Sequence, residues 1–300
     1  MFATLIGRYS AAPGASTPDD AVRQVIAELA AAGLEPLSDG HGARPVGTSA
    51  EAIQIVDAWR RAASYTDRAV KQTLVGPYTL AADRHVAPAA VAAPVQEAIA
   101  ALAAAGCPIV EIEEPAAVEA GDDAHEQRRF VEGLRAATDG LGEVVHLSLV
   151  LTGGNVDALP AAALYDLPFS SYAFDLIAGP ENWRLIAQAP ADRGIVVGAL
   201  DPSPDADDRP EVLVWGAQYA ASIAARGLVR VGLANASGLA GLSWERARAK
   251  VRALGEAARL AALSTPDDLA AALDPRAVDI RSAAAGRYIP ADRKQPRGRL

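Results

Sequence analysis

Short apolar runs alternate along most of the chain with longer stretches in which apolar residues recur at helical spacing. The short runs are rich in leucine and β-branched residues and almost continuously apolar, which is typical of strands buried on both faces. We therefore predict strands at Phe2–Gly7, Leu34–Ser38, Thr73–Val75, Ile109–Glu113, Glu143–Leu149, Phe169–Phe174, Ile195–Leu200 and Val229–Leu233. The helices are expected near 18–32, 50–65, 87–105, 124–138, 156–164, 180–189, 209–225 and 243–262.

Helix start and stop residues support this alternation. Thr17 followed by Pro18 is typical of a helix N-terminus, as is Ser243 before the last predicted helix. Glycines follow several helices immediately before the next strand, where a helix is expected to end. They are Gly33, Gly106, Gly194 and Gly227.

Eight strand–helix units in series predict an α/β fold with a parallel sheet closed into a (βα)8 TIM barrel. Residues 1–263 are enough for one such domain. The first strand is not followed by a GxGxxG motif, which argues against an open dinucleotide-binding sheet. Over 264–300 we expect a short helix at 265–273 and then a basic, mobile tail, with an arm that packs on a second copy as the alternative.

Composition narrows the classes of partner. The formal net charge is −9, so nucleic acid and anionic membranes are poor partners for the chain. Its single cysteine, Cys107, rules out a disulfide framework or a site with several thiolate ligands within one chain. With neither a signal peptide nor a transmembrane run in the sequence, we expect a soluble, cytoplasmic protein that acts on a small molecule.

Polar residues follow the predicted strands, and in a barrel these positions gather at the carboxyl-terminal rim, where active sites lie. Glu113 and Glu114 end one strand, so one side chain should face the barrel mouth and the other the helices. Such carboxylates can bind an amine or a metal, or act as acid and base, unless they are only a solvated pair. His146 is either a buried, satisfied histidine or a ligand or general base. Arg8 and Ser10 follow the first strand and could hold an anionic group, or form an ordinary loop.

Six segments in order resemble the cobalamin-independent methionine synthase family. They are Leu5-Ile6-Gly7-Arg8-Tyr9, Leu37-Ser38-Asp39-Gly40-His41, Val75-Gly76-Pro77-Tyr78-Thr79-Leu80, Val110-Glu111-Ile112-Glu113-Glu114-Pro115-Ala116, His146-Leu147-Ser148, and Ser237-Gly238-Leu239 with Trp244-Glu245. The resemblance covers roughly residues 3–260, and the segment that ends in Glu113-Glu114-Pro115 is the most specific.

The resemblance implies a site in which zinc, held by one histidine, two cysteines and a glutamate, activates a thiol for methylation. Its histidine corresponds to His146, its cysteines to Ser148 and Ser237, and its glutamate lies near Asp175. Serine is a poor zinc ligand because its hydroxyl stays protonated, so we expect no tightly bound zinc. A weaker site for another divalent metal, built on His146 and Asp175, is the alternative.

The resemblance also implies substrate contacts. The family's amine-binding glutamate corresponds to His41, and Asp201 lies just after the position of its Asp-x-His motif. We therefore take Glu113, Glu114, His146 and Asp201 as candidate catalytic residues. Candidate substrate-binding residues are Arg8, Ser10, His41, Tyr78, Ser148 and Ser237.

The function implied by the resemblance is methyl transfer to a small molecule, with a corrinoid protein as one possible methyl donor and a homodimer as one possible assembly. A binding protein that has lost the chemistry is a second hypothesis. A decarboxylase on the same barrel is a third, although the chain lacks the arginine-rich N-terminal motif of uroporphyrinogen decarboxylases.

Overall fold

The computed structural model describes residues 1–206 and 208–263, so the helix and basic tail expected over 264–300 lie outside the described residues. Within the described residues, seven parallel strands form one sheet in the order β1-β7-β6-β5-β4-β3-β2. The strands are β1 (Phe2–Thr4), β2 (Gln72–Val75), β3 (Ile109–Glu113), β4 (His146–Leu151), β5 (Ser171–Asp175), β6 (Gly194–Leu200) and β7 (Val231–Asn235).

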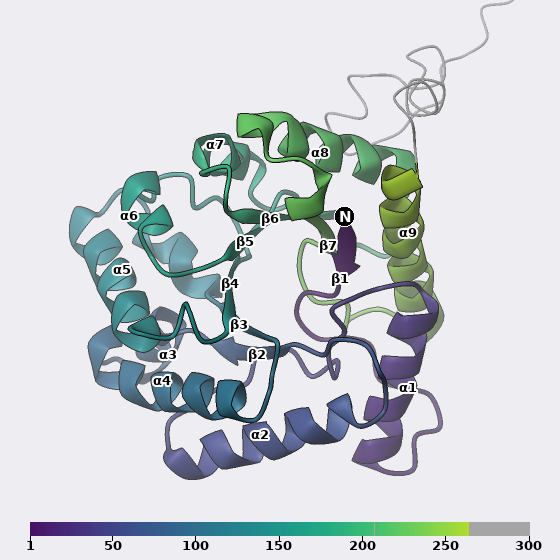
Figure 1. The fold of residues 1–300 in the computed structure, drawn as a ribbon, viewed down its shortest axis with the longest axis horizontal. Helices are drawn as coiled ribbons and strands as arrows, with labels where there is room; N and C mark the ends of the chain where they lie inside the picture. Colours follow the sequence, from purple (N-terminus) through teal and green to yellow (C-terminus); the bar gives the residue numbers. More distant parts are fainter. Residues whose placement is uncertain (207, 264–300) are drawn as a thin grey trace, which may run out of the picture.

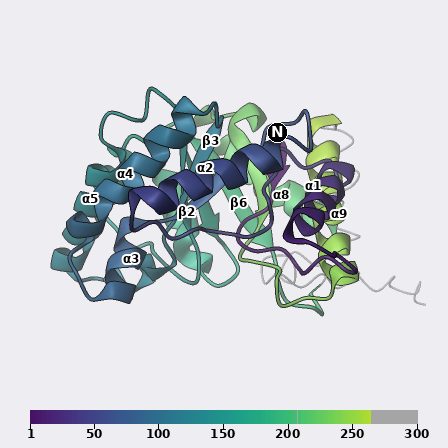
Figure 2. The same ribbon diagram turned by 90° about the horizontal axis from the view of Figure 1, so that it is seen from below.

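The sheet curls around a central axis, and the helices lie outside it (Figure 1). The α-helices are α1 (Pro18–Ala31), α2 (Ser49–Ala63), α3 (Pro77–Arg84), α4 (Pro88–Ala104), α5 (Ala124–Thr138), α6 (Ala161–Tyr165), α7 (Trp183–Gln188), α8 (Pro210–Ser222) and α9 (Trp244–Leu263). Short 3-10 turns are η1 (Pro115–Ala120), η2 (Pro180–Asn182), η3 (Ile223–Ala225) and η4 (Leu228–Arg230). In the perpendicular view of Figure 2, α2 and α4 cross in front of the strands. None of the described helices is long and apolar enough to cross a membrane.

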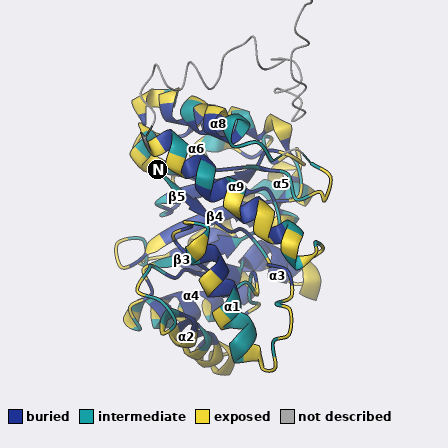
Figure 3. Cartoon of the chain, turned by 90° about the vertical axis from the view of Figure 1, so that its right-hand side faces the viewer, coloured by how far each residue is buried: buried dark blue, intermediate teal, exposed yellow. Residues whose placement is uncertain are grey.

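Two sets of apolar side chains form the core, because successive strand residues point to opposite faces of the sheet. The larger set lies between the sheet and the inner faces of the helices, while the outer faces are exposed (Figure 3). A smaller set fills the inside of the curled sheet. Its members are Ile6, Val150, Ala173, Val196 and Ala234, with Phe2 packed against them.

The strand predicted at Leu34–Ser38 is the main difference from the expected fold. This segment does not form a regular strand; only Leu37 makes a parallel bridge, to Val70. Pro36 has no N–H to donate, which interrupts a regular hydrogen-bond ladder. The segment still reaches both edge strands: the Glu35 N–H donates to the Ala3 carbonyl at 2.9 Å, and the Leu37 N–H to the Ala69 carbonyl at 2.8 Å.

Other elements also differ from the sequence prediction. Pro77–Arg84 forms the helix α3, where the sequence predicted no helix. In addition, β4 spans His146–Leu151 and not Glu143–Leu149. This shift changes the end of the sheet at which His146 lies.

Candidate functional site

Glu113 is the clearest candidate for chemistry at the carboxyl-terminal end of the strands. It ends β3, beside Val75 of β2 and Val150 of β4 in the sheet register. Burial and, to a smaller extent, the negative charge of Glu111 raise the pKa of Glu113 to about 7, against the opposing effect of the Lys71 charge. The Thr152 hydroxyl lies 3.5 Å from Glu113 Oε1. Because Glu113 is only partly buried, a ligand at this end could exchange a proton with it.

Glu114 points the other way and caps a helix. Its Oε1 accepts the Tyr78 N–H at 2.9 Å, and its Oε2 accepts the Thr79 N–H at 2.8 Å and the Thr79 hydroxyl at 2.6 Å. The carboxyl is fully buried, and this burial raises its pKa to about 7 against the opposing effect of these three bonds. The expected split, with one glutamate facing the mouth and the other the helices, is therefore present, and Glu114 has a structural role at the N-terminus of α3.

Other polar residues at this end are also held in backbone contacts. Asp175 Oδ1 accepts the N–H groups of Ile177 and Ala178, and its Oδ2 accepts that of Gly153. Ser10 donates to the carbonyls of Leu239 and Leu242 at 3.0 Å each.

Asn235 is likewise held by backbone hydrogen bonds, and it links the end of β7 to the residues that follow β1. Its side chain accepts the Ile6 N–H and donates to the carbonyls of Ile6 and Ser237. The side chains of Asp175, Ser10 and Asn235 therefore hold the loops at this end in place, and their polar atoms are already bonded to the backbone.

The loop after residue 38 carries charged groups next to the first strand. Arg8 and His41 are both exposed and form an antiparallel bridge. Asp39 is buried, accepts the His41 N–H at 2.9 Å and pairs with Arg44 at 2.5 Å. The Ser38 hydroxyl, also buried, has no hydrogen-bond partner among the described residues. The His41 Nδ1 also lies 3.7 Å from Asp39 Oδ2, and Arg8 is exposed beside it, so an anionic ligand could reach Arg8 at this place.

The three remaining candidates at this end occupy different surroundings. The Tyr78 hydroxyl donates to Glu126 at 2.9 Å and its ring packs edge-on against Phe130, so it lies among helices. Asp201 follows β6 and its carboxylate accepts the Ser203 N–H at 2.8 Å. Ser237 is partly exposed after β7.

His146 and Ser148 lie at the amino-terminal end of the sheet, contrary to their expected place on the carboxyl-terminal rim. His146 is the first residue of β4, and Ser148 pairs with Ser171, the first residue of β5. In this register Thr152 lies level with Asp175. His146 is therefore about 20 Å from Asp175 along the strands, at roughly 3.3 Å per residue.

The proposed metal pair of His146 and Asp175 is thus not brought together. Among the described residues, no group of three or more His, Cys, Asp or Glu side chains is arranged to hold a metal ion. Cys107 is buried before β3, so it does not reach the carboxyl-terminal end either.

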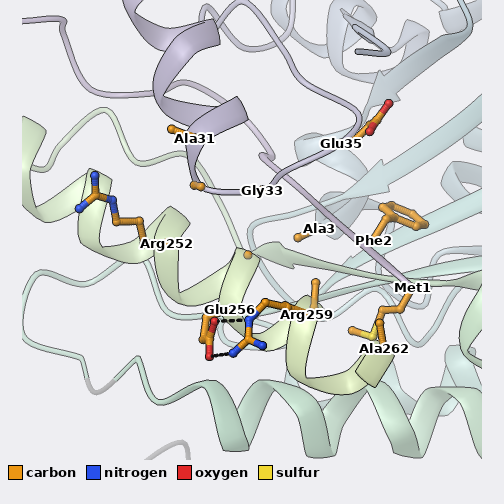
Figure 4. A pocket seen from close by; sticks show the side chains of 13 residues that line it. Met1, Phe2, Ala3, Ala31, Gly33, Glu35, Arg252, Glu256, Arg259 and Ala262 are labelled. Carbon is orange, nitrogen blue, oxygen red and sulfur yellow. Dashed lines mark hydrogen bonds and ion pairs between the residues drawn. The ribbon is translucent and has the colours of Figure 1, made fainter. Parts of the chain in front are cut away.

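Two hollows open at the amino-terminal end of the strands. One, a cavity of about 540 Å³ on the barrel axis, has Lys71, Glu111, His146, Ser148 and Ser171 among its lining residues. The other, a groove of about 830 Å³, lies between α9 and the end of α1 (Figure 4). Of its charged residues, Glu256 and Arg259 bond each other and Arg252 pairs with Glu28, while Glu35 and several alanines line the rest. The axial cavity, in contrast, holds the buried pair of Lys71 and Glu111 together with serine hydroxyls.

Sequence reasoning missed several of these residues. Lys71 is fully buried and bonds Glu111 at 2.7 Å, and Thr73 donates to the same carboxylate at 2.9 Å. The signal was strand alternation, since Lys71 and Thr73 share a face, as do Glu111 and Glu113. Strand alternation could not identify Thr152, because the strand was predicted to end at Leu149 and β4 ends at Leu151.

No protein-family model and no curated protein sequence matches this chain. Similar folds occur among solved structures. A B12-independent methionine synthase from Shewanella sp. W3-18-1 aligns with a TM-score of 0.70 at 15% identity, covering 86% of this chain and 96% of the other. A putative vitamin-B12 independent methionine synthase from Listeria monocytogenes gives 0.65 at 16% identity, covering 86% and 97%.

D-psicose 3-epimerase from Clostridium cellulolyticum H10 is similar at a lower level, with a TM-score of 0.53 at 12% identity, covering 87% of this chain and 99% of the other. These likenesses establish a TIM-barrel-like fold. At such identities they do not carry an activity from one protein to another.

Proposed function

We propose that this chain is a methyltransferase of the methionine synthase-like superfamily that acts on a small molecule through Glu113. The main support is the position of Glu113 at the carboxyl-terminal end of the strands, where barrel enzymes have their active sites. Burial raises the pKa of this carboxyl group to about 7. Methyl transfer is proposed as the reaction because two structures with a similar fold are named as B12-independent methionine synthases, one of them putative.

Glu113 would act as the base for the methyl acceptor. A thiol of ordinary pKa, about 8.5, is matched well enough to a carboxylate of pKa near 7 for proton transfer in the transition state. Glu113 takes the thiol proton, and the sulfur lone pair forms the new bond to the methyl carbon. The bond between that carbon and the donor breaks, and its electron pair stays with the donor, for which a methylated corrinoid is our proposal.

The zinc site of the resembling family does not fit these residues. Val150 and Thr152 occupy the inner positions near the end of β4, and neither is a zinc ligand of the usual kind. The Asp175 carboxylate is already held by three backbone N–H groups. We therefore propose that the zinc ligands are replaced in this chain, and we route no step through a metal.

We also propose that residues 34–38 take the place of an eighth strand and close the barrel. The support is their bonding to both edges of the sheet, from Glu35 to Ala3 and from Leu37 to Ala69. A further bond runs from the Lys71 N–H to the Leu37 carbonyl at 2.9 Å. Closure matters for the function because it brings Arg8 and His41 onto the same rim as Glu113.

One observation favours a second candidate, a binding protein without catalysis. Several polar side chains at this end already form hydrogen bonds with backbone groups, which leaves few groups for chemistry. They belong to Ser10, Glu114, Asp175 and Asn235. Such a protein would use Arg8, His41 and Glu113 to hold a ligand.

The test is methyl transfer from methylcobalamin to homocysteine and related thiols, followed by mass spectrometry of the product. We expect wild-type turnover, a rate that rises with pH through about 7, and a loss of at least about 100-fold in Glu113→Gln. Glu143→Gln is the matched control, because Glu143 is an exposed carboxyl outside the site.

Product formation that is equal in Glu113→Gln and the wild type would overturn the role of Glu113. Absence of product from every thiol, together with thiol binding that Glu113→Gln weakens, would contradict methyl transfer and support the binding protein.

A further inference from the structure

We propose that the cavity at the amino-terminal end of the barrel is a second binding site, for a neutral, oxygen-rich small molecule of the polyol class. This site is separate from the carboxyl-terminal end, where Glu113 lies, and it does not depend on the proposed methyl transfer. Its volume of about 540 Å³ is in the range of small-molecule sites.

The cavity lies on the barrel axis, because residues from every side of the sheet line it. Thr4 of β1, Lys71 before β2 and Glu111 of β3 contribute to it, as do Ser148 of β4 and Ser171 of β5. All five are buried. His146 stands at the opening, exposed, with its Nε2 2.8 Å from the Ser171 hydroxyl.

Small residues create the hollow. Barrel interiors are normally filled by layers of bulky side chains. Here Ser148, Ser171 and Gly194 stand side by side on three neighbouring strands, since Ser171 pairs with both of the others. A hollow left by small core residues is destabilising unless something fills it.

Two donor groups that line this cavity can form further hydrogen bonds. The Lys71 ammonium has three N–H donors, but among the described residues it bonds one group, Glu111. Ser148 lines the cavity, and its hydroxyl, which is accessible from the cavity, forms no hydrogen bond with another described residue. A ligand that displaces water from these donors must supply acceptors in its place, so they favour an occupant that carries acceptor oxygens.

Charge decides the class of that occupant. Lys71 and Glu111 neutralise each other at the base of the cavity. Glu35, Asp192 and Arg230 line the opening and together carry one net negative charge. An anion would meet the acidic rim and Glu111, and an ammonium group would meet Lys71. A neutral molecule with several hydroxyls can accept from Lys71 and Ser148 and donate to Ser171 without a charge penalty.

The experiment is an NMR titration of the protein with myo-inositol, with succinate and putrescine as anionic and cationic probes. We expect myo-inositol to shift the amide signals of Ser148, Ser171 and Gly194. Ser148→Phe, which extends a ring into the cavity, should weaken this binding at least tenfold. Ser203→Phe, the same exchange on an exposed loop at the other end, should leave it unchanged.

His146→Ala provides a second variant, because this exposed side chain can be removed without disturbing the core; we expect binding about threefold weaker. The proposal is overturned if myo-inositol shifts none of the three amides, or if Ser148→Phe and His146→Ala both bind it like the wild type. Stronger binding of succinate or putrescine than of myo-inositol overturns the proposal that the ligand is neutral. None of these outcomes bears on Glu113, which is tested separately by methyl transfer.

Discussion

Glu113 and Glu114 are neighbours in the sequence, yet the fold gives them opposite surroundings. Strand alternation places Glu113 on the inner face, where burial and then the charge of Glu111 raise its pKa. It places Glu114 at the N–H groups at the start of α3. The sequence predicts this division, because successive residues of a strand face opposite ways. It could not predict the partners, since Thr79 and Thr152 belong to segments whose register was unknown.

A pH-dependent stability follows from the Glu113 pKa. Its folded-state pKa of about 7 lies above the ordinary value of 4.5, so between these values the folded state binds more protons than the unfolded state. The free energy of unfolding should therefore fall as pH rises from about 4.5 to about 7. We expect Glu113→Gln to remove about 1–3 kcal/mol of this fall, measured by urea denaturation at pH 5 and pH 8.

Other groups also titrate in this range, so the informative quantity is the difference between the two proteins. Glu143→Gln should follow the wild type at both pH values, because Glu143 is exposed. A fall in stability that Glu113→Gln leaves intact would show that this carboxyl is not the one responsible.

At the scale of elements, the start of α3 depends on the absence of a side chain at residue 76. A Cβ on Gly76 would lie 2.2 Å from Glu114 Cδ, so the capping carboxyl would have to move. Gly76→Ala should then leave the N–H groups of Tyr78 and Thr79 buried without their acceptor. We expect a loss of about 2–4 kcal/mol in the free energy of unfolding, measured by urea denaturation.

Gly241→Ala is the control, since a Cβ there meets no atom within 4 Å. It should change stability by less than about 0.5 kcal/mol. Equal stability of the two variants would mean that the Glu114 cap contributes little to α3.

Strands and helices were predictable where periodicity and end signals agreed. The prediction of β3 at Ile109–Glu113 is confirmed, and α1 begins at Pro18 after its Thr17 cap, as expected. The misses have local causes. No helix was predicted at Pro77, although proline is favourable in the first turn of a helix, and Pro36 interrupts an otherwise strand-like run.

At the scale of the molecule, the end of the barrel on which a residue lies depends on strand register. A shift of three residues in the start of β4 moved His146 from the expected active-site rim to the opposite opening. Apolar runs fix the existence of a strand better than its limits, because a buried strand has no polar alternation to mark its ends. The end of the sheet at which a residue lies could therefore be predicted for Glu113 but not for His146.

The two ends of the barrel are joined electrostatically through Lys71 and Glu111. The Lys71 Nζ and Glu111 Oε2 atoms are 2.7 Å apart, and both side chains are almost fully buried. Lys71→Met leaves a buried carboxylate without its cation and should cost about 3–5 kcal/mol of unfolding free energy, and Glu111→Gln should cost a similar amount.

The double variant should be more stable than the sum of the two losses predicts, by about 2 kcal/mol, because it leaves neither charge unpaired. Urea denaturation of the four proteins gives this coupling energy. Losses that add to within about 0.5 kcal/mol would mean that the pair is not a unit. Lys71→Met should also raise the pKa of Glu113, since the Lys71 charge lowers it and the Glu111 charge would then act alone. The midpoint of the methyl-transfer pH profile should therefore move upward in this variant, so that a change at one end of the barrel is measured at the other.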